Sequence, residues 1–161
     1  MGRGFESRRE HHLFMEYHLD FQATAVSYKN QAVLITGPSG VGKTALALRL
    51  IENGAVLIGD DIVEIFIKNK QLYCKDKEKL KGIIEVRGLG LVAGLKVARP
   101  AKVVCIVRLT AQKTDRMPEI KTMVLLDKKI PVFDFYACET NFIQVLYALK
   151  VLNKELTLLK E

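Results

Sequence analysis

Short apolar or alternating runs recur along the chain, and they predict strands. Residues 21–28 (FQATAVSY) alternate roughly between apolar and polar, and residues 31–36 (QAVLIT) form a nearly continuous apolar run. The polar residues 68–70 separate two further runs and suggest a hairpin. The remaining predicted strands cover residues 55–58, 62–67, 71–74, 102–109, 123–126 and 130–135.

Two segments have helical character instead. Residues 43–52 (KTALALRLIE) are rich in Ala and Leu, and Asn53-Gly54 supplies a stop signal. Residues 141–154 carry an apolar stripe at helical spacing. The stretches 75–82 and 110–119 are polar and are expected to be exposed. Because strands dominate after the first strand–loop–helix unit, the pattern predicts an α/β fold with a mixed sheet, not a regular alternation.

Length and composition fit one soluble globular unit. The chain has 161 residues, of which 49% are hydrophobic and 27% charged. No apolar run approaches the roughly 20 residues that a membrane span needs. Residues 1–14 are basic and lack the apolar core of a secretory signal. We expect them to be poorly ordered or to precede the true start, with Met15 as the alternative start, and residues 15–161 to form a single domain.

Cysteine spacing indicates the state of the thiols, and the net charge indicates the kind of partner. Cys74, Cys105 and Cys138 lie about thirty residues apart, which predicts reduced thiols of a cytoplasmic protein and neither a disulfide frame nor a zinc site. The formal net charge of +7 suits an acidic partner such as a nucleotide. The lysines are spread along the chain without a nucleic-acid-binding module, so a nucleic-acid partner is not favoured.

Residues 37–44 read GPSGVGKT, the full Walker A spacing, between a predicted strand and a predicted helix. Glycines let the backbone N–H groups curl around an anion, and the helix N-terminus adds partial positive charge. Lys43 is expected to reach the β- and γ-phosphates, and the Thr44 hydroxyl to complete a Mg²⁺ shell. The predicted nucleotide-binding residues are Gly37, Pro38, Ser39, Gly40, Val41, Gly42, Lys43 and Thr44.

The phosphate loop alone leaves a GTPase-like switch, a small-molecule kinase, a protein kinase and a passive nucleotide binder open. No base-reading motif of the NKxD kind is evident, which disfavours the switch. Asp60 and Asp61 follow the strand after the phosphate-loop helix, and such a strand usually neighbours the phosphate-loop strand. One carboxylate there can accept a proton from an incoming hydroxyl while the other orients it or helps to hold Mg²⁺. The alternative is an aspartate pair that only ends a strand in a solvated turn.

Residues 85–90 (EVRGLG) place Glu85 and Arg87 at alternate positions of one predicted strand face. The pair fits a metal-binding carboxylate and a phosphate-clamping guanidinium. It equally fits an exposed ion pair before a turn.

Together these motifs resemble the catalytic domain of HPr kinase/phosphorylase, in a short form without the N-terminal domain. The resemblance rests on GPSGVGKTALALRLI, GAVLIGDD and IEVRGLG in that order and spacing, with TDRMPE further on, and runs from about Phe21 to Leu152. It implies a P-loop kinase fold of the HPr kinase / phosphoenolpyruvate-carboxykinase-like type, with a mixed β-sheet, a phosphate-loop helix and a C-terminal helix.

The resemblance implies a cytoplasmic, hexameric serine kinase, and in many members also a phosphorylase, that uses ATP and Mg²⁺ and acts on HPr or an HPr-like protein. Asp60 would be the general base that takes the serine proton, with Asp61 in support. Thr44 and Glu85 would bind the metal, and residues 87–90 would form the catalytic loop. Arg116, in TDRMPE, matches a mobile active-site arginine that clamps the transferring phosphate.

One position departs from the family pattern. Members commonly carry a His before the phosphate loop, in HAT, where this sequence has Gln22 in FQAT. Gln cannot titrate, so only hydrogen bonding remains. His18 lies four residues earlier, about 13 Å away on an extended strand. The departure at Gln22 therefore leaves open a nucleotide-sensing module with weakened catalysis. A small-molecule kinase also stays open, because its site would look the same from sequence.

Overall fold

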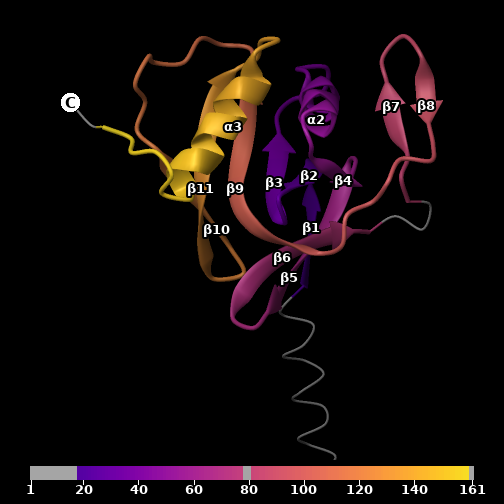
Figure 1. The fold of residues 1–161 in the computed structure, drawn as a ribbon, viewed down its shortest axis with the longest axis horizontal. Coiled ribbons are helices and arrows are strands. Elements are labelled where there is room, and N and C mark those ends of the chain that lie inside the picture. The colour runs from indigo at the N-terminus through magenta and orange to yellow at the C-terminus, as the bar shows by residue number, and fades with distance from the viewer. Residues whose placement is uncertain (1–17, 78–80, 160–161) are drawn as a thin grey trace, which may run out of the picture.

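The computed structural model describes residues 18–77 and 81–159 (Figure 1). Their largest element is a sheet of nine strands. Its main path runs in the order β1 (His18–Gln22), β5 (Ile62–Lys68), β6 (Gln71–Asp76), β9 (Ala101–Thr110), β3 (Gln31–Thr36), β2 (Thr24–Tyr28) and β4 (Val56–Gly59). β11 (Lys128–Tyr136) also pairs with β9, and β10 (Lys121–Leu125) pairs with β11. The hairpin of β7 (Ile84–Val86) and β8 (Gly90–Val92) forms a second, small sheet.

Strand direction brings four carboxyl ends to one edge of the sheet. β3 and β11 are both parallel to β9. β2 is antiparallel to β3 and to β4, so β4 runs in the same direction as β3. The chain segments that leave β3, β4, β9 and β11 therefore meet at one edge, together with the start of β2. Open sheets with parallel strands commonly bind ligands at such an edge.

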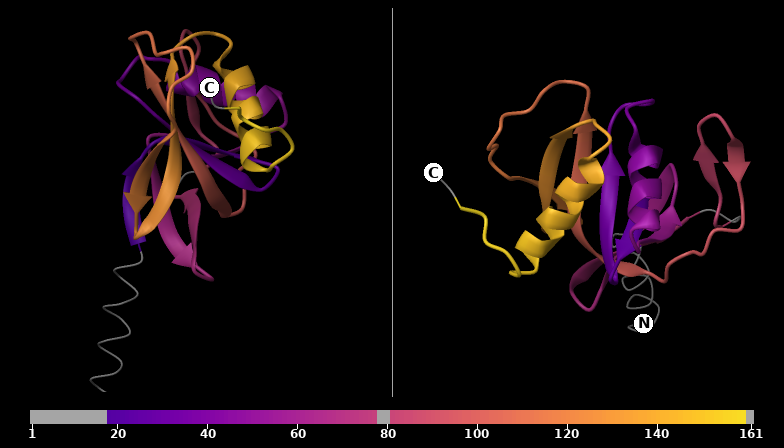
Figure 2. Two further views of the ribbon diagram at one scale, coloured as in Figure 1. Left: turned by 90° about the vertical axis from the view of Figure 1, so that its left-hand side faces the viewer. Right: turned by 45° about the horizontal axis from the view of Figure 1, so that its top comes forward.

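The apolar core is divided between the two sides of the sheet. α2 (Lys43–Glu52) and α3 (Asn141–Leu152) cover one face, as Figures 1 and 2 show, and Leu50 and Leu149 pack there against β2, β3 and β9. On the other face β5 and β6 supply Ile65 and Cys74, which pack with Leu34 of β3 in a second cluster. Both clusters consist of side chains that are almost fully buried, so the strand ends are held on a rigid base.

The predicted elements are largely confirmed. α2 has the predicted bounds, and Asn53 forms its C-cap. The strands predicted from residues 31–36, 62–67, 71–74, 102–109 and 130–135 appear as β3, β5, β6, β9 and β11, with ends that move by at most a few residues. The helix predicted over residues 141–154 ends at Leu152. Of the polar stretch 110–119, residues 111–119 are exposed and carry no helix or strand, as expected, whereas Thr110 ends β9.

Two expectations are wrong. The strand predicted over residues 21–28 is two strands, because the chain breaks at Ala23, whose N–H donates to the carbonyl of Asp61 at 2.9 Å. β1 then pairs with β5, while β2 pairs with β3 and β4. The strand before Asp60 does not neighbour the phosphate-loop strand either, since β2 lies between β4 and β3. Because β2 is antiparallel to both, Asp60 still reaches the edge where the phosphate loop begins.

Residues 1–14, for which disorder or an alternative start is expected, lie outside the described residues, as do residues 78–80 of the polar stretch 75–82. The three cysteines are free, as predicted. Burial raises the pKa of the Cys105 thiol to about 12 and also raises that of Cys74, so both are poor nucleophiles. No helix in the described part of the chain is long and apolar enough to cross a membrane.

Candidate active site

The edge where the strand ends meet contains a cavity of about 1050 Å³. Its walls come from four segments that are distant in the sequence: the end of β1 with the start of β2, the phosphate loop with α2, the turn after β4, and the β7–β8 hairpin. The cavity is lined by Gln22, Ala23, Thr24, Thr36, Gly37, Pro38, Ser39, Gly40, Gly42, Lys43, Thr44, Ala45, Leu48, Asp60, Asp61, Glu85, Val86 and Arg87. The predicted site residues are thus brought together, apart from Val41, which packs into the helix-side core, and Arg116.

The phosphate loop is closed on itself by its own lysine. Lys43 Nζ donates to the carbonyl oxygen of Gly37 at 2.6 Å and to that of Pro38 at 3.2 Å. Gly37 lies so close to β9 that a Cβ there would be 2.7 Å from the carbonyl oxygen of Leu109. α2 begins at Lys43 directly after Gly42, so its unpaired N–H groups face the cavity. The loop therefore has the curled backbone, the helix N-terminus and the cation that bind a phosphate group.

Asp60 is oriented by Thr24, which is not among the predicted site residues. Thr24, which is 1% exposed, donates from Oγ1 to Asp60 Oδ1 at 2.8 Å. Asp61 adopts a left-handed backbone conformation with a φ of 74°, and its carbonyl oxygen accepts the Ala23 N–H. These two bonds join the turn after β4 to the junction of β1 and β2. Thr24 lies two positions after Gln22, so the two side chains would share one face of the strand predicted over residues 21–28. This shared face is the signal in the sequence that could have identified Thr24 as a site residue.

Glu85 and Arg87 line the same cavity from the hairpin, although they do not share a strand face. β7 ends at Val86, so Arg87 stands in the turn before β8. Its guanidinium reaches the phosphate loop, because Arg87 Nη2 would lie 3.6 Å from a Cβ placed on Gly40. A guanidinium at that place can contact the oxygens of a bound phosphate. Glu85 offers a carboxylate to a cation on the same side of the cavity.

Gln22 is exposed at the end of β1 and faces the cavity beside the aspartates. His18 stands at the other end of β1, where it pairs with Glu64 and stacks on Phe66 with ring centroids 6.1 Å apart. Gln22 therefore offers only an amide to the cavity, and His18 is engaged elsewhere.

Arg116 does not line the cavity, contrary to expectation. It lies in the exposed segment 111–120, which leaves the end of β9 on the other side of the phosphate loop from Asp60. Residues of this segment instead line a second cavity, together with Gly37 and Pro38.

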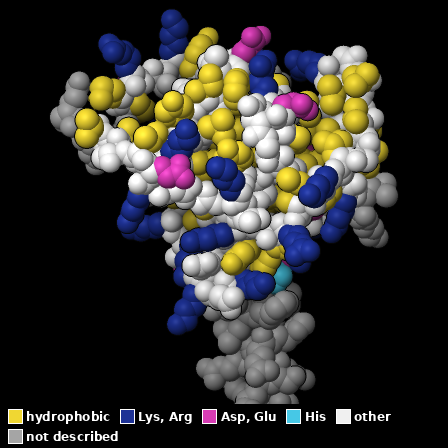
Figure 3. Space-filling model, viewed as in Figure 1, with side chains coloured by type: hydrophobic (Ala, Val, Ile, Leu, Met, Phe, Trp, Pro, Cys, Tyr) yellow, Lys and Arg dark blue, Asp and Glu magenta, His cyan; other side chains and the backbone are white. Residues whose placement is uncertain are grey.

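The next two features are the distribution of basic side chains on the surface and the grouping of side chains that could bind a metal ion. Lys and Arg side chains are scattered over the face shown in Figure 3 and do not gather into one patch. Within residues 18–77 and 81–159, no three His, Cys, Asp or Glu side chains cluster as a metal site. A divalent cation in the large cavity would therefore depend on single groups such as Thr44 and Glu85 together with ligand oxygens.

Comparison with known proteins agrees with this geometry. The family model for the HPr Serine kinase C-terminal domain matches residues 17–141. HPr kinase/phosphorylase of Mycoplasmopsis pulmonis is 43% identical over 74 residues, which are 46% of this chain and 24% of the relative. The Chlorobium phaeobacteroides protein of the same name is 29% identical over 154 residues, covering 88% of this chain and 47% of the relative. The chain thus spans at most about half the length of these relatives.

The fold is also found in a solved structure. The HPr(Ser) kinase/phosphatase from Coxiella burnetii superposes with a TM-score of 0.69 at 25% sequence identity, over 85% of this chain and 90% of that chain. The mixed sheet with its phosphate-loop helix and C-terminal helix is therefore the fold of a known phosphotransfer enzyme.

Proposed function

Since the chain belongs to the family of HPr serine kinase C-terminal domains, we propose that it is an ATP- and Mg²⁺-dependent serine kinase acting on HPr or an HPr-like protein. The observation that carries the proposal is that Asp60 lines one cavity with the phosphate loop and Arg87. A donor phosphate on the loop and a base for the acceptor would then share one space. The proposal includes the reverse reaction, in which inorganic phosphate attacks the phosphoserine.

Asp60 would act as the general base. Its Oδ1 accepts the Thr24 hydrogen bond, and the second oxygen is left to take the proton of the acceptor serine. The serine oxygen then attacks the γ-phosphorus, the bond to the β-phosphate oxygen breaks, and ADP leaves with that oxygen. In the reverse direction the protonated carboxyl would return the proton to the serine oxygen. Asp61 is proposed to support Asp60 through the backbone turn that both residues occupy.

Cations around the loop would stabilise the charge on the transferring phosphate. Lys43 donates to the carbonyls of Gly37 and Pro38, and it would have to exchange these bonds for bonds to phosphate oxygens. Arg87 approaches from the hairpin. Mg²⁺, held by Thr44, Glu85 and the nucleotide, would neutralise the β- and γ-phosphate oxygens. Arg116 remains a proposed clamp that has to move toward the cavity to act.

The proposal is tested by phosphotransfer from ATP to purified HPr in the presence of Mg²⁺. Wild-type protein should yield phosphoserine, and Asp60→Asn should reduce the rate by at least about 100-fold, because the isosteric amide cannot accept the proton. ATP affinity should stay within about twofold, since Asp60 does not belong to the phosphate loop.

The matched control is Asp127→Asn, which changes an aspartate in the β10–β11 turn that does not line the cavity. It should leave the rate unchanged. Phosphoserine formation at the wild-type rate by Asp60→Asn would refute the assignment of Asp60. No transfer to any HPr by the wild-type protein, even at high enzyme concentration, would refute the kinase itself.

Gln22 favours a second candidate, a nucleotide-sensing module of the same fold. In that case the wild-type protein binds ATP tightly but does not turn it over. A small-molecule kinase is the third candidate, because the same cavity could accept another hydroxyl. Transfer from ATP to a small hydroxyl compound, and not to HPr, would identify it.

The assembly and the location follow from the family and are part of the proposal. We propose a homo-hexamer in the cytoplasm, whose solution mass would be about six times 18.1 kDa.

A further inference from the structure

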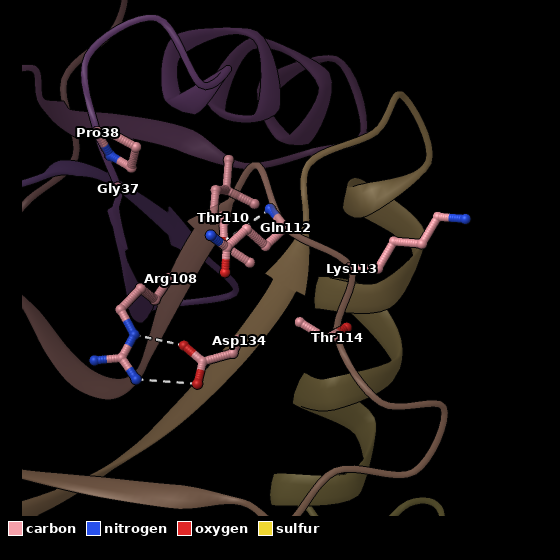
Figure 4. Close-up of a pocket in the computed structure, with 9 residues that line it drawn as sticks. Gly37, Pro38, Arg108, Thr110, Gln112, Lys113, Thr114 and Asp134 are labelled. Atoms are coloured by element: carbon pink, nitrogen blue, oxygen red, sulfur yellow. Dashed lines mark hydrogen bonds and ion pairs between the residues drawn. The ribbon is translucent and has the colours of Figure 1, made fainter.

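A second cavity, of about 440 Å³, lies beside the phosphate loop and contains none of the residues to which a role is assigned above except Gly37 and Pro38. Figure 4 shows it between the start of the loop, the ends of β9 and β11, and the segment that follows β9. Its volume is within the range of small-molecule sites, which is roughly 300–1000 Å³. The residues that line it include Arg108, Gln112, Thr114 and Asp134.

The position of this cavity follows from the order of the strands. The phosphate loop leaves β3, with β2 and then β4 on one side and β9 and then β11 on the other. Asp60 follows β4, so the reacting end of a triphosphate on the loop points to the β4 side. The rest of the donor has to leave toward the β9 side. The second cavity lies there, and it shares the first two residues of the loop with the large cavity.

The charge of the second cavity argues against another phosphate. Arg108 donates to both carboxylate oxygens of Asp134, with Nη2 to Oδ2 at 3.0 Å, and the two charges cancel. Lys113 also lines the cavity, but its side chain extends away from the other labelled residues (Figure 4). The walls are thus nearly neutral and carry amide and hydroxyl groups from Gln112 and Thr114, which suits an uncharged heterocycle and a sugar.

Arg108 presents the surface that a base requires. Its hydrogen-bonding edge is occupied by Asp134 on the neighbouring strand, which fixes the plane of the guanidinium. The side chain is nevertheless 41% exposed. A guanidinium that is held at its edge and open at its face can stack on an aromatic ring.

We propose that the second cavity binds the nucleoside of the phosphate donor, with the base stacked on the guanidinium of Arg108. The inference rests on the proposed function, because it takes the phosphate loop as the site of a nucleoside triphosphate. It adds residues that would determine how the protein distinguishes a nucleotide from a bare polyphosphate.

The test compares the binding of ATP and of inorganic tripolyphosphate, both with Mg²⁺, by titration calorimetry. The wild-type protein should bind ATP at least about tenfold more tightly, since only ATP reaches the second cavity. Arg108→Ala should weaken ATP binding about tenfold and leave tripolyphosphate binding unchanged. Arg108→Lys keeps the charge but not the plane, and should weaken ATP binding similarly.

Lys121→Ala is the matched control. Lys121 is the other cation on Asp134, with Nζ to Oδ2 at 3.0 Å, but it does not line the cavity. Both affinities should stay at the wild-type values in this variant. The comparison within the wild-type protein needs no variant, so it remains decisive if Arg108→Ala does not fold.

Two outcomes would overturn the inference while the proposed function stands. One is equal affinity of the wild-type protein for ATP and tripolyphosphate. The other is an equal loss of both ligands in Arg108→Ala, which would make Arg108 a phosphate contact. Failure of the wild-type protein to bind either ligand would overturn the inference together with the proposed function.

Discussion

Asp60 is held by a neighbour that is itself immobile. Thr24 is buried at the start of β2 and fixes Oδ1 of Asp60, so the carboxylate is oriented before any substrate arrives. In the proposed role of Asp60 as general base, this fixed orientation would lower the reorganisation that proton transfer requires. Gln22 stands on the other side of Ala23 and faces the same cavity, but an amide neither gives nor takes a proton at ordinary pH.

Replacement of Gln22 by His should therefore add a titratable group next to an oriented carboxylate. We expect Gln22→His to raise the rate of phosphotransfer to HPr about tenfold or more. The rate should also acquire a pH dependence with an apparent pKa between about 6 and 7, which the wild-type profile lacks. Initial rates between pH 5.5 and pH 8.5 measure both effects.

Gln22→Asn is the control, because it keeps the amide and only shortens the side chain. It should not raise the rate and should not alter the shape of the pH profile. An unchanged rate in Gln22→His would show that the amide is not what limits catalysis.

At the scale of the elements, a cluster of ion pairs joins three neighbouring strands at the wall of the second cavity. Arg108 of β9 and Asp134 of β11 are direct partners in the parallel ladder. Lys121 of β10 reaches the same carboxylate. Hydrogen bonds from Arg108 and then from Lys121 lower the pKa of Asp134 below its ordinary value of 3.8. Asp134 is therefore charged in the folded protein at any pH above its lowered pKa.

When the pKa of a carboxyl is lower in the folded than in the unfolded chain, the ionised carboxylate stabilises the fold at pH values above the unfolded-state pKa. This stabilisation is lost as the pH falls through the folded-state pKa. Asp134→Asn should thus lower the free energy of unfolding by about 1–2 kcal/mol at pH 7. The difference from wild type should begin to shrink below pH 3.8, where the carboxyl takes up a proton in the unfolded chain, and should disappear as the pH falls through the lower folded-state pKa. Urea unfolding at pH 7 and at pH 3 measures this.

Asp20→Asn is the comparison variant, since Asp20 pairs with Lys77 on the surface and is 56% exposed. It should change the free energy of unfolding by less than about 0.5 kcal/mol at either pH. A loss in Asp134→Asn that is the same at both pH values would contradict the electrostatic origin of the effect.

Local signals in the sequence explain which elements were predictable. α2 was predicted with its bounds because helix propensity, the glycine loop before it and Asn53-Gly54 after it all lie within a few residues. The break at Ala23 was not, because it depends on a hydrogen bond to Asp61. The position of β4 beyond β2 likewise depends on pairing that composition does not encode.

The same distinction holds for the site. The phosphate loop and Asp60 could be predicted because each is a contiguous motif in an ordinary strand context. Arg108 and Asp134 could not, because their importance comes from a partner 26 residues away. For Thr24 the sequence offered only its alternation with Gln22, and not its bond to Asp60, which lies 36 residues away. Arg116 was placed by motif alone, and the structure puts it on an exposed segment outside the large cavity.

At the scale of the whole molecule, ligand binding and folding depend on the same structural elements. The large cavity is built from both ends of the β1–β2 junction, the start of α2, the turn after β4 and the small hairpin. A ligand that contacts all of them binds only the folded chain. Its binding free energy should therefore add to the stability of the entire fold.

ATP with Mg²⁺ should raise the melting temperature of the wild-type protein. At a free ligand concentration 100 times Kd the added stability is about 2.7 kcal/mol, which corresponds to about 5–10 °C for a chain of this size. Lys43→Ala should abolish most of this shift, because it removes the loop cation that is proposed to contact the phosphates and that now bonds the Gly37 carbonyl. Lys96→Ala, at an exposed position outside the large cavity, should retain the shift. The shift on ligand addition is the quantity to compare, since loss of the Lys43 bonds to the loop alters the ligand-free melting temperature as well. An equal shift in Lys43→Ala would mean that ATP binds somewhere other than the phosphate loop.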